Sequence, residues 1–281
     1  MFTTKLNFFD PYKIALSGQA FRIHPIDDSH VETVAMGRYL QIAALGDNEF
    51  AFNCSEDEFE SIWKGYFDLN RDYEAIYNTI EDDAYLKAAA DYGYGIRILK
   101  QDPWEAIISY IISQRRSIPS ITTCVDRLSE LCGTQVSMPA LGEPFVRPLK
   151  DVYYAFPSVE QMSGLSPEDL ANIGAGYRGP YITSAVNDFA SGKLTREMMD
   201  SADDDTLLAL LLNMFGVGIK VANCVMLFAF SRTGRFPIDV WIQRILDKYY
   251  CGQFNKNPYG DTAGIMQQFM FYYERCEKTH I

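Results

Sequence analysis

Lys220 is the first candidate for a chemically reactive residue. It lies in the stretch NMFGVGIKVANCVMLFAF at positions 213–230. The pattern predicts a helix that ends before a Gly-x-Gly turn and a second, apolar helix that begins directly after it. A helix N-terminus disfavours a cation, and apolar neighbours disfavour any charge. Both effects favour the neutral amine, a nucleophile that forms Schiff bases with aldehydic carbons.

Asp239 lies nineteen residues after this lysine, in FPIDVWIQRIL, at the predicted start of another helix. A carboxylate at this position is expected to be an N-cap. A capping carboxylate with a free face also stabilises a cation that develops nearby. Lysine and aspartate, without histidine or metal, suit displacement at a sugar C1′ through an oxocarbenium-like state.

The cysteines and histidines argue against other chemistries. The six cysteines form no C-x-x-C pair, so neither thiolate-bound zinc nor an iron–sulfur cluster is expected. His24, His30 and His280 all lie far from the middle of the chain, which excludes a histidine-based triad or a histidine-rich metal site in the core. No redox or organic cofactor is expected.

The net charge of −12 argues against nucleic acid as a partner, but the charge is unevenly distributed. Residues 106–125, 170–187 and 206–238 contain no Asp or Glu. Buried helices lack acids, which explains much of this pattern. The basic residues in these windows fall at predicted turns, however, which favours a surface kept free of acidic residues for binding a polyanion. Charge alone leaves both interpretations open. These residues are Arg115, Arg116, Arg178, Lys220, Arg232 and Arg235.

The pattern of elements predicts an α+β fold. Short β-rich pieces such as YLQIAALG and EFAFNCS indicate an N-terminal antiparallel sheet domain over residues 1–98. From DPWEAIISYIISQR onward, where Asp102 and Pro103 mark a helix start, the pattern is helical through residues 99–281. The longest near-apolar run is about half of the roughly 20 residues that span a bilayer, and no signal peptide is seen, so we expect a soluble intracellular protein.

The turn at Gly216, Val217 and Gly218 belongs to a predicted helix–hairpin–helix at about 205–230. Exposed N–H groups at the start of the second helix form an anion site that suits a phosphate. Such a hairpin binds a DNA backbone through main-chain amides. Because this contact needs few basic side chains, an acidic protein can also make it. An ordinary αα-hairpin remains the alternative for a Gly-x-Gly turn taken alone.

NMFGVGIKVANC followed by FPIDV resembles the helix–hairpin–helix–Gly/Pro–Asp superfamily of DNA glycosylases. Within it, nearly the whole chain resembles the 8-oxoguanine DNA glycosylase/AP lyases of the bacterial or archaeal branch. The resemblance implies that Lys220 displaces the damaged base and holds the sugar as a Schiff base, with Asp239 as the motif's acidic residue. It also implies a monovalent cation held by backbone carbonyls around Leu212, Met214 and Val217.

The same resemblance implies a pocket for the damaged base. LSGQAFRI places Gly18 where a carbonyl accepts the N7 hydrogen that 8-oxoguanine has and guanine lacks. QQFMF, in a helix predicted at about 261–276, places Gln267 at the base's Watson–Crick edge and Phe271 on its face. Cys224, one helical turn after the lysine, packs against the flipped base in this family. Taken alone, Cys224 also fits a small core residue. Phe271 taken alone favours a core position over a stacking platform, and its spacing to Gln267 is what favours stacking.

Three further segments are implied to contact DNA. In IGAGYRGPY, Tyr177 wedges into the base stack and Arg178 contacts the orphaned cytosine. In SQRRSIPS, Arg115 stands where the family's eukaryotic members carry a gap-filling asparagine, and Ser120 where they carry another cytosine-contacting arginine. Trp241 replaces a phosphate-binding histidine. These departures predict that bases other than cytosine are accepted opposite the lesion.

The resulting hypothesis is a monomeric, cytoplasmic, nucleoid-associated prokaryotic enzyme that acts on double-stranded DNA containing 8-oxoguanine. It flips the lesion out of the duplex, as base-modifying enzymes do, excises it and nicks the strand by β-elimination. A monofunctional alkylbase glycosylase of the same fold is one alternative, and it would not need Lys220. A non-catalytic helix–hairpin–helix DNA-binding module is the other, and it would have no use for Gly18, Gln267 and Phe271 in one pocket.

Overall fold

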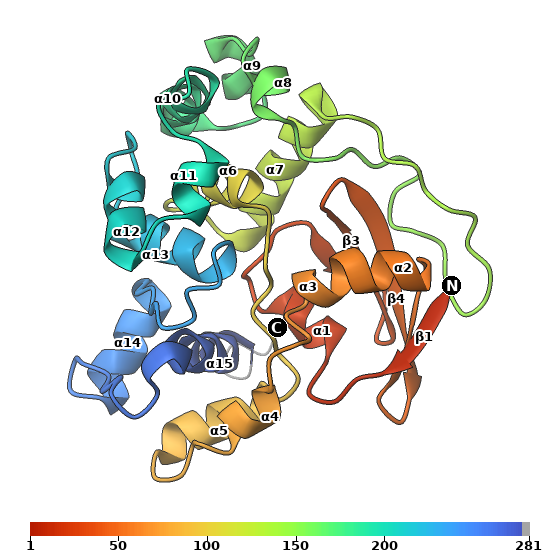
Figure 1. Ribbon diagram of the computed structural model, residues 1–281, viewed down its shortest axis with the longest axis vertical. Coiled ribbons are helices and arrows are strands. Elements are labelled where there is room, and N and C mark those ends of the chain that lie inside the picture. The colour runs from red at the N-terminus through yellow and green to blue at the C-terminus, as the bar shows by residue number, and fades with distance from the viewer. Residues whose placement is uncertain (277–281) are drawn as a thin grey trace.

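The computed structural model describes residues 1–276. A five-stranded antiparallel sheet forms in the N-terminal part, and most of the remaining chain is helical (Figure 1). This arrangement confirms the predicted α+β class. The end of the predicted helical domain at residue 281 lies outside the described residues, as does His280.

The strands of the sheet follow the order β1-β5-β4-β3-β2. Met36 and Gly37 connect β3 to β4, and Asp47 and Asn48 connect β4 to β5; all four have positive φ. Two-residue turns of this kind match the right-handed twist of the strands that they join. The strands are β1 (Phe2–Lys5), β2 (Ile23–Pro25), β3 (His30–Ala35), β4 (Arg38–Gly46) and β5 (Glu49–Phe52).

A helical segment directly after the sheet covers the sheet's apolar residues. It consists of α2 (Glu56–Glu58), a π-helical turn (Phe59–Trp63) and α3 (Lys64–Tyr66). Leu40, Phe52 and Trp63 belong to one hydrophobic cluster and are completely buried. Alternate strand residues point to the same face, which is why apolar residues on β4 and β5 meet this segment together.

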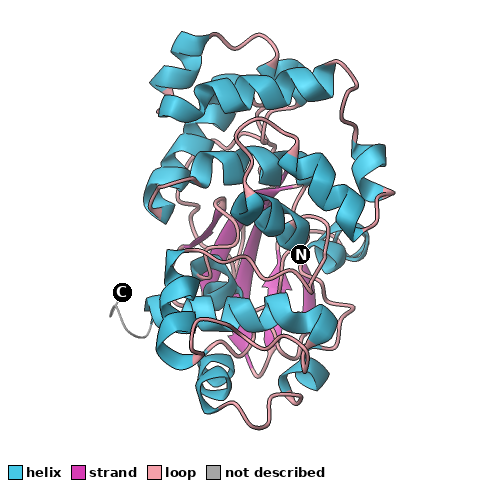
Figure 2. Cartoon of the chain, turned by 90° about the vertical axis from the view of Figure 1, so that its left-hand side faces the viewer, coloured by secondary structure: helices cyan, strands magenta, loops and turns pink. Residues whose placement is uncertain are grey.

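The helices of the second part lie beside the sheet and in front of it in Figure 2. None of the helices in residues 1–276 is both long and apolar enough to cross a membrane. The α-helices outside the sheet-covering segment are α1 (Pro11–Leu16), α4 (Tyr73–Tyr77), α5 (Ala84–Tyr92), α6 (Pro103–Ser113), α7 (Ile118–Cys132), α8 (Val159–Met162), α9 (Pro167–Asn172), α10 (Gly179–Ala190), α11 (Arg196–Asp200), α12 (Asp204–Leu212), α13 (Ile219–Phe228), α14 (Val240–Tyr249) and α15 (Ala263–Cys276).

One hydrophobic core joins helices that are far apart in sequence. α6 packs against α13, and α15 packs against both α5 and α14. Leu86 of α5, Ile108 of α6 and Phe269 of α15 are completely buried in the same cluster. Because α5 precedes residue 98, a helix within the predicted N-terminal domain packs with the helical core. The division at residue 98 remains a prediction.

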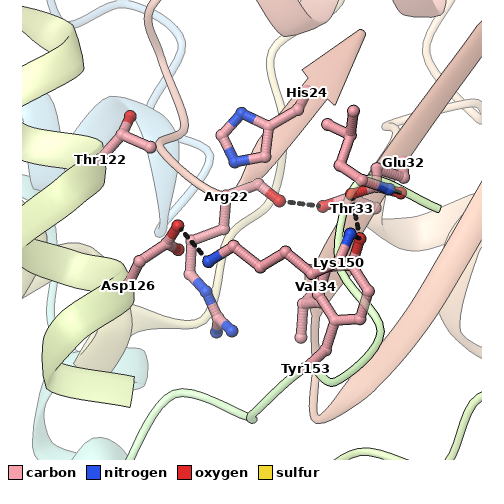
Figure 3. Close-up of a pocket in the computed structure, with 10 residues that line it drawn as sticks. Arg22, His24, Glu32, Thr33, Val34, Thr122, Asp126, Lys150 and Tyr153 are labelled. Carbon is pink, nitrogen blue, oxygen red and sulfur yellow. Dashed lines mark hydrogen bonds and ion pairs between the residues drawn. The ribbon is translucent and has the colours of Figure 1, made fainter. Parts of the chain in front are cut away.

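Charged side chains connect the sheet to α7. They line a cavity of about 230 Å³ between β2, β3, α7 and the segment around residue 150 (Figure 3). Lys150 pairs with Asp126 of α7 at 2.8 Å. Glu32 of β3 accepts hydrogen bonds from the hydroxyls of Tyr39 and Tyr153. Since Lys150 and Glu32 are both bonded to neighbouring side chains, we interpret the cavity as a structural joint between sheet and helices.

A mostly buried carboxyl next to this joint predicts a pH-dependent stability. Glu105 lies in the first turn of α6, 3.8 Å from the Arg22 guanidinium. Burial raises the pKa of Glu105 to about 7, although Arg22 acts in the opposite direction. A raised carboxyl pKa means that the folded state binds more protons than the unfolded state. The contribution of Glu105 to stability is therefore fully present below its unfolded pKa and is lost as pH rises through 7.

Between pH 5 and pH 8, Glu105 should therefore lower the unfolding free energy of the unchanged protein by about 1–3 kcal/mol. The Glu105→Gln protein should not show this decrease. Urea unfolding of both proteins at the two pH values measures this difference. The carboxyl would not be the source if the two proteins showed the same change with pH.

Candidate active site

Five segments converge on a cavity of about 50 Å³, which holds only a few water molecules. They are α6, α13, α15, the loop before α14 and the segment after α1. The cavity brings together all six residues to which the sequence assigned catalysis or base recognition. A purine can enter only if the walls move. The lining residues are Gly18, Tyr110, Lys220, Cys224, Phe228, Pro237, Asp239, Gln267, Gln268 and Phe271.

Lys220 is the second residue of α13, and its half-buried side chain lines this cavity. Its Nζ lies 5.5 Å from the ring centroid of Tyr110, which places the amine over an aromatic face. The Tyr110 ring in turn stacks on Phe228 at 5.8 Å. Within residues 1–276 no carboxylate lies within ion-pair distance of Lys220. The amine therefore lies in a cavity beside aromatic rings and is not held by a counter-ion from the described residues.

Asp239 combines a structural role with a free oxygen. Its Oδ1 accepts hydrogen bonds from the N–H groups of Trp241 at 3.0 Å and Ile242 at 2.9 Å, so it is the N-cap of α14, as predicted. No hydrogen bond or ion pair to Oδ2 is formed by the residues that the structure describes. One carboxylate oxygen thus begins the helix, and the other is available to the cavity.

Cys224 is buried one helical turn after the lysine. Burial raises the pKa of its thiol, and the nearby Lys220 lowers it by a smaller amount. The protonated thiol behaves as a small apolar group. Its place in the cavity wall suits packing against a flat ligand.

Gln267 presents an unsatisfied acceptor to the cavity. The residue is 5% exposed, and its Oε1 is buried without a hydrogen-bond partner. A buried acceptor without a partner costs about 1–3 kcal/mol, so such a group indicates a missing ligand donor or an ordered water. Phe271 lies on the same helix, α15, one turn after Gln267.

Gly18 lies against Phe271 in a conformation that favours glycine. Its φ is +74°, and a Cβ atom there would lie 2.8 Å from Ile118 Cδ1 and 3.1 Å from Phe271 Cε1. A side chain would therefore push the ring and the α7 residue away. The close approach explains why the sequence has a glycine between Ser17 and Gln19.

The hairpin between α12 and α13 has one tight glycine and one open glycine. Gly216 has φ +83°, and a Cβ there would lie 2.3 Å from the Tyr181 ring of α10. Gly218, the N-cap of α13, has open space around it and offers no side chain to cap the helix. The first N–H groups of α13 are consequently exposed to an anion.

The hairpin carbonyls that the resemblance assigns to a monovalent cation differ in their hydrogen bonding. Val217 donates its N–H to the Met214 carbonyl at 3.1 Å. The Leu212 and Val217 carbonyls accept no hydrogen bond from the described residues. Uncharged carbonyl oxygens of this kind are suitable ligands for a monovalent cation.

Gln114, at the C-terminus of α6, joins the hairpin to the two other segments predicted to contact DNA. Its Nε2 donates to the Gly216 carbonyl at 3.0 Å, and its own carbonyl accepts hydrogen bonds from Tyr177 and Arg178. Tyr177 is 51% exposed, as a wedge requires. Arg178 is buried, and its guanidinium is directed at this carbonyl instead of at solvent. Arg115 is exposed and has φ +53°.

The acid-free windows do not leave all their arginines free for a polyanion. Arg232 pairs with Asp204 at 3.1 Å and Arg235 with the same residue at 2.9 Å. Asp204 begins α12, two residues before the acid-free window starts, and tertiary packing brings it back to both arginines. For these two arginines, the ion pairs with Asp204 argue against the interpretation of a surface kept clear for a polyanion. Trp241 is half-buried and faces the Arg244 guanidinium at 5.4 Å.

Four residues of the cavity were not identified from the sequence. Tyr110 and Phe228 form the aromatic floor under the lysine, and Pro237 and Gln268 complete the wall. Gln268 follows Gln267 directly. Two adjacent amide side chains in a helix that is otherwise apolar at this point were the signal that could have identified Gln268. The aromatic pair gives no local signal, because α6 and α13 are distant in sequence.

The chain is similar to known DNA repair enzymes over most of its length. Residues 1–107 match the family described as "8-oxoguanine DNA glycosylase, N-terminal domain". The probable N-glycosylase/DNA lyase of Methanothermobacter thermautotrophicus is 31% identical over 238 residues, which cover 74% of this chain and 72% of that protein. The N-glycosylase/DNA lyase of Saccharomyces cerevisiae is 30% identical over 78% of this chain and 57% of its own.

A solved structure shows the same fold. The 8-oxoguanine glycosylase/lyase of Clostridium acetobutylicum, in complex with double-stranded DNA that contains cytosine opposite 8-oxoguanine, superimposes with a TM-score of 0.86 at 31% identity. The match covers 98% of this chain and 94% of that one. Sequence, fold and converging side chains agree, and the chain belongs to the 8-oxoguanine DNA glycosylase/DNA lyase family.

Proposed function

We propose that this protein binds double-stranded DNA, flips 8-oxoguanine into the cavity at Lys220, excises the base and nicks the strand. The observation that carries this proposal is the buried, unpartnered Oε1 of Gln267 in the same cavity as the Lys220 amine. An acceptor that lacks a donor and a nucleophile that lacks a counter-ion meet the two needs of a base-excising site. The relatives named above support the same activity.

In the proposed reaction, Lys220 Nζ forms a bond to C1′ as the bond from C1′ to N9 breaks. The nitrogen becomes a secondary ammonium and loses a proton, the departing base anion takes up a proton, and the free oxygen of Asp239 stabilises the positive charge that develops on the sugar. Opening of the sugar ring gives an iminium between lysine and C1′. Loss of a C2′ proton then expels the 3′ phosphate, which nicks the strand 3′ to the lesion.

Recognition of the base is assigned to the cavity wall. The Gly18 carbonyl accepts the N7 hydrogen, and Gln267 accepts from an N–H on the Watson–Crick edge. Phe271 stacks on one face of the base while Cys224 packs against it from α13. Guanine lacks the N7 hydrogen, so it would leave the Gly18 carbonyl buried without a donor, at a cost of about 1–3 kcal/mol.

Binding of the DNA backbone is assigned to the hairpin between α12 and α13. The exposed N–H groups at the start of α13 bind a phosphate, and Gly218 leaves space for it. A monovalent cation on the carbonyls of Leu212, Met214 and Val217 would supply a positive charge beside that phosphate. Tyr177 fills the gap that the flipped base leaves in the base stack. Trp241 packs at the position where the family carries a phosphate-binding histidine. The enzyme acts as a monomer and needs no redox cofactor.

The test is borohydride trapping on two duplexes, one with 8-oxoguanine and one with an alkylated purine. Reduction converts an iminium into a stable protein–DNA adduct, so the lesion duplex should give a covalent complex and a nicked strand. The alkylated duplex should give neither product. Base release without an adduct would favour a monofunctional glycosylase, and binding without base release a DNA-binding module; either result would overturn the proposal.

A second expectation concerns the base opposite the lesion. Arg178 is buried against a carbonyl. Ser120 stands where eukaryotic members of the family carry a cytosine-contacting arginine, and Arg115 where they carry a gap-filling asparagine. With such contacts absent, excision rates opposite the four bases should spread over less than about a hundredfold. Single-turnover excision on the four duplexes measures this spread. A preference for cytosine on the order of a thousandfold or more would contradict it.

A further inference from the structure

Three successive carbonyls, those of Ser17, Gly18 and Gln19, pass the edge of the cavity. The two outer carbonyls accept hydrogen bonds from buried side chains that no sequence motif identified. The central carbonyl, that of Gly18, accepts none from residues 1–276. The segment thus has one open acceptor between two occupied ones.

The first outer contact comes from α15. Gln268 is 2% exposed, and its Nε2 donates to the Ser17 carbonyl at 2.7 Å. This residue adjoins Gln267, so the helix that carries the unsatisfied acceptor also holds the segment that carries Gly18. Displacement of either group is resisted by the same packed helix.

The second outer contact comes from α6. The buried hydroxyl of Tyr110 donates to the Gln19 carbonyl at 2.7 Å, and Gln101 donates to the same carbonyl at 2.8 Å. The side chain of Gln19 is also held, because its Oε1 accepts from the Leu99 N–H at 2.7 Å. Since the Tyr110 ring faces Lys220 as well, one side chain connects the nucleophile to the recognition segment.

We propose that Gln268 and Tyr110 are positioning residues that set the discrimination between 8-oxoguanine and guanine by fixing the direction of the Gly18 carbonyl. The proposal rests on the proposed function. Discrimination depends on one hydrogen atom, and a fixed carbonyl meets the N7 lone pair of guanine with repulsion. A carbonyl that is free to turn would both bind the lesion less well and tolerate guanine, and recognition needs positions held within about 0.5 Å.

The experiment compares Tyr110→Phe, Gln268→Met and the double variant with the unchanged protein. Tyr110→Phe keeps the ring beside Lys220 and removes only the hydroxyl, so the nucleophile keeps its support. Two single-turnover rates are measured, excision of 8-oxoguanine and nicking of an abasic duplex, which has no base to recognise. A matched control is Tyr272→Phe, a buried tyrosine of α15 that does not line this cavity.

In the double variant, the rate of 8-oxoguanine excision should fall at least roughly tenfold more than the rate of abasic nicking. Tyr110→Phe alone should show a smaller loss in the same direction, because Gln101 still donates to the Gln19 carbonyl. The control should change neither rate. An equal loss on both substrates, or no loss on the lesion, would overturn the positioning role. If the unchanged protein failed to excise 8-oxoguanine, the proposed function itself would fall.

Discussion

Replacing Lys220 by Gln is expected to abolish both the trapped adduct and strand nicking, with a loss of roughly 10⁴-fold or more. Glutamine has a similar length, but its amide nitrogen is not a nucleophile, so no iminium forms. The side chain makes no ion pair with a described carboxylate, and its removal should therefore leave the fold intact. Borohydride trapping and nicking assays on the lesion duplex measure the effect.

The matched control for this prediction is Lys248→Gln. Lys248 is an exposed lysine of α14 that does not line the cavity, so its loss should leave trapping unchanged. Binding of the Lys220→Gln protein to an uncleaved lesion duplex should persist, which separates chemistry from recognition. Strand nicking that survived the loss of Lys220 would rule out the lysine as the nucleophile.

Replacing Asp239 by Asn is expected to lower excision about 10²–10³-fold while stability hardly changes. Asparagine caps helices as well as aspartate does, so the hydrogen bonds from the N–H groups of Trp241 and Ile242 remain. What is lost is the negative charge beside the developing cation. Excision rates and thermal unfolding measured on one preparation test both halves of the prediction.

The control for the capping role is Asp203→Asn. Asp203 caps α12 through the Thr206 N–H at 2.8 Å, outside the cavity. This change should affect neither stability nor excision. Asp239→Ala should in addition lose about 0.5–2 kcal/mol of stability, because the cap itself disappears. If Asp239→Asn retained full excision, the aspartate would serve only as a cap.

These two residues were predictable because their signals are local. A Gly-x-Gly turn followed by an apolar helix places Lys220 within the first turn of α13. Asp239 stands before an amphipathic run, and an N-cap is defined by hydrogen bonds to residues two and three positions later. Such contacts depend on backbone geometry over a few residues, so the order of residue types is sufficient to predict them.

The other members of the cavity depended on resemblance, or were missed, because their contacts are not local. Gly18 meets Phe271 across more than 250 positions of sequence, and Tyr110 meets Lys220 across about a hundred. Arg178 was assigned to a DNA-contacting loop by resemblance, and its burial against the Gln114 carbonyl follows from how two loops pack.

The sequence by itself determined the α+β class, the hairpin, the caps and the candidate nucleophile. The tertiary structure decided which side chains share a cavity, which arginines are paired internally and which carbonyl is left without a donor. The physical reason is that periodicity and capping arise from neighbours along the chain. Convergence of distant side chains arises from the way whole helices pack, and many residues determine that packing together.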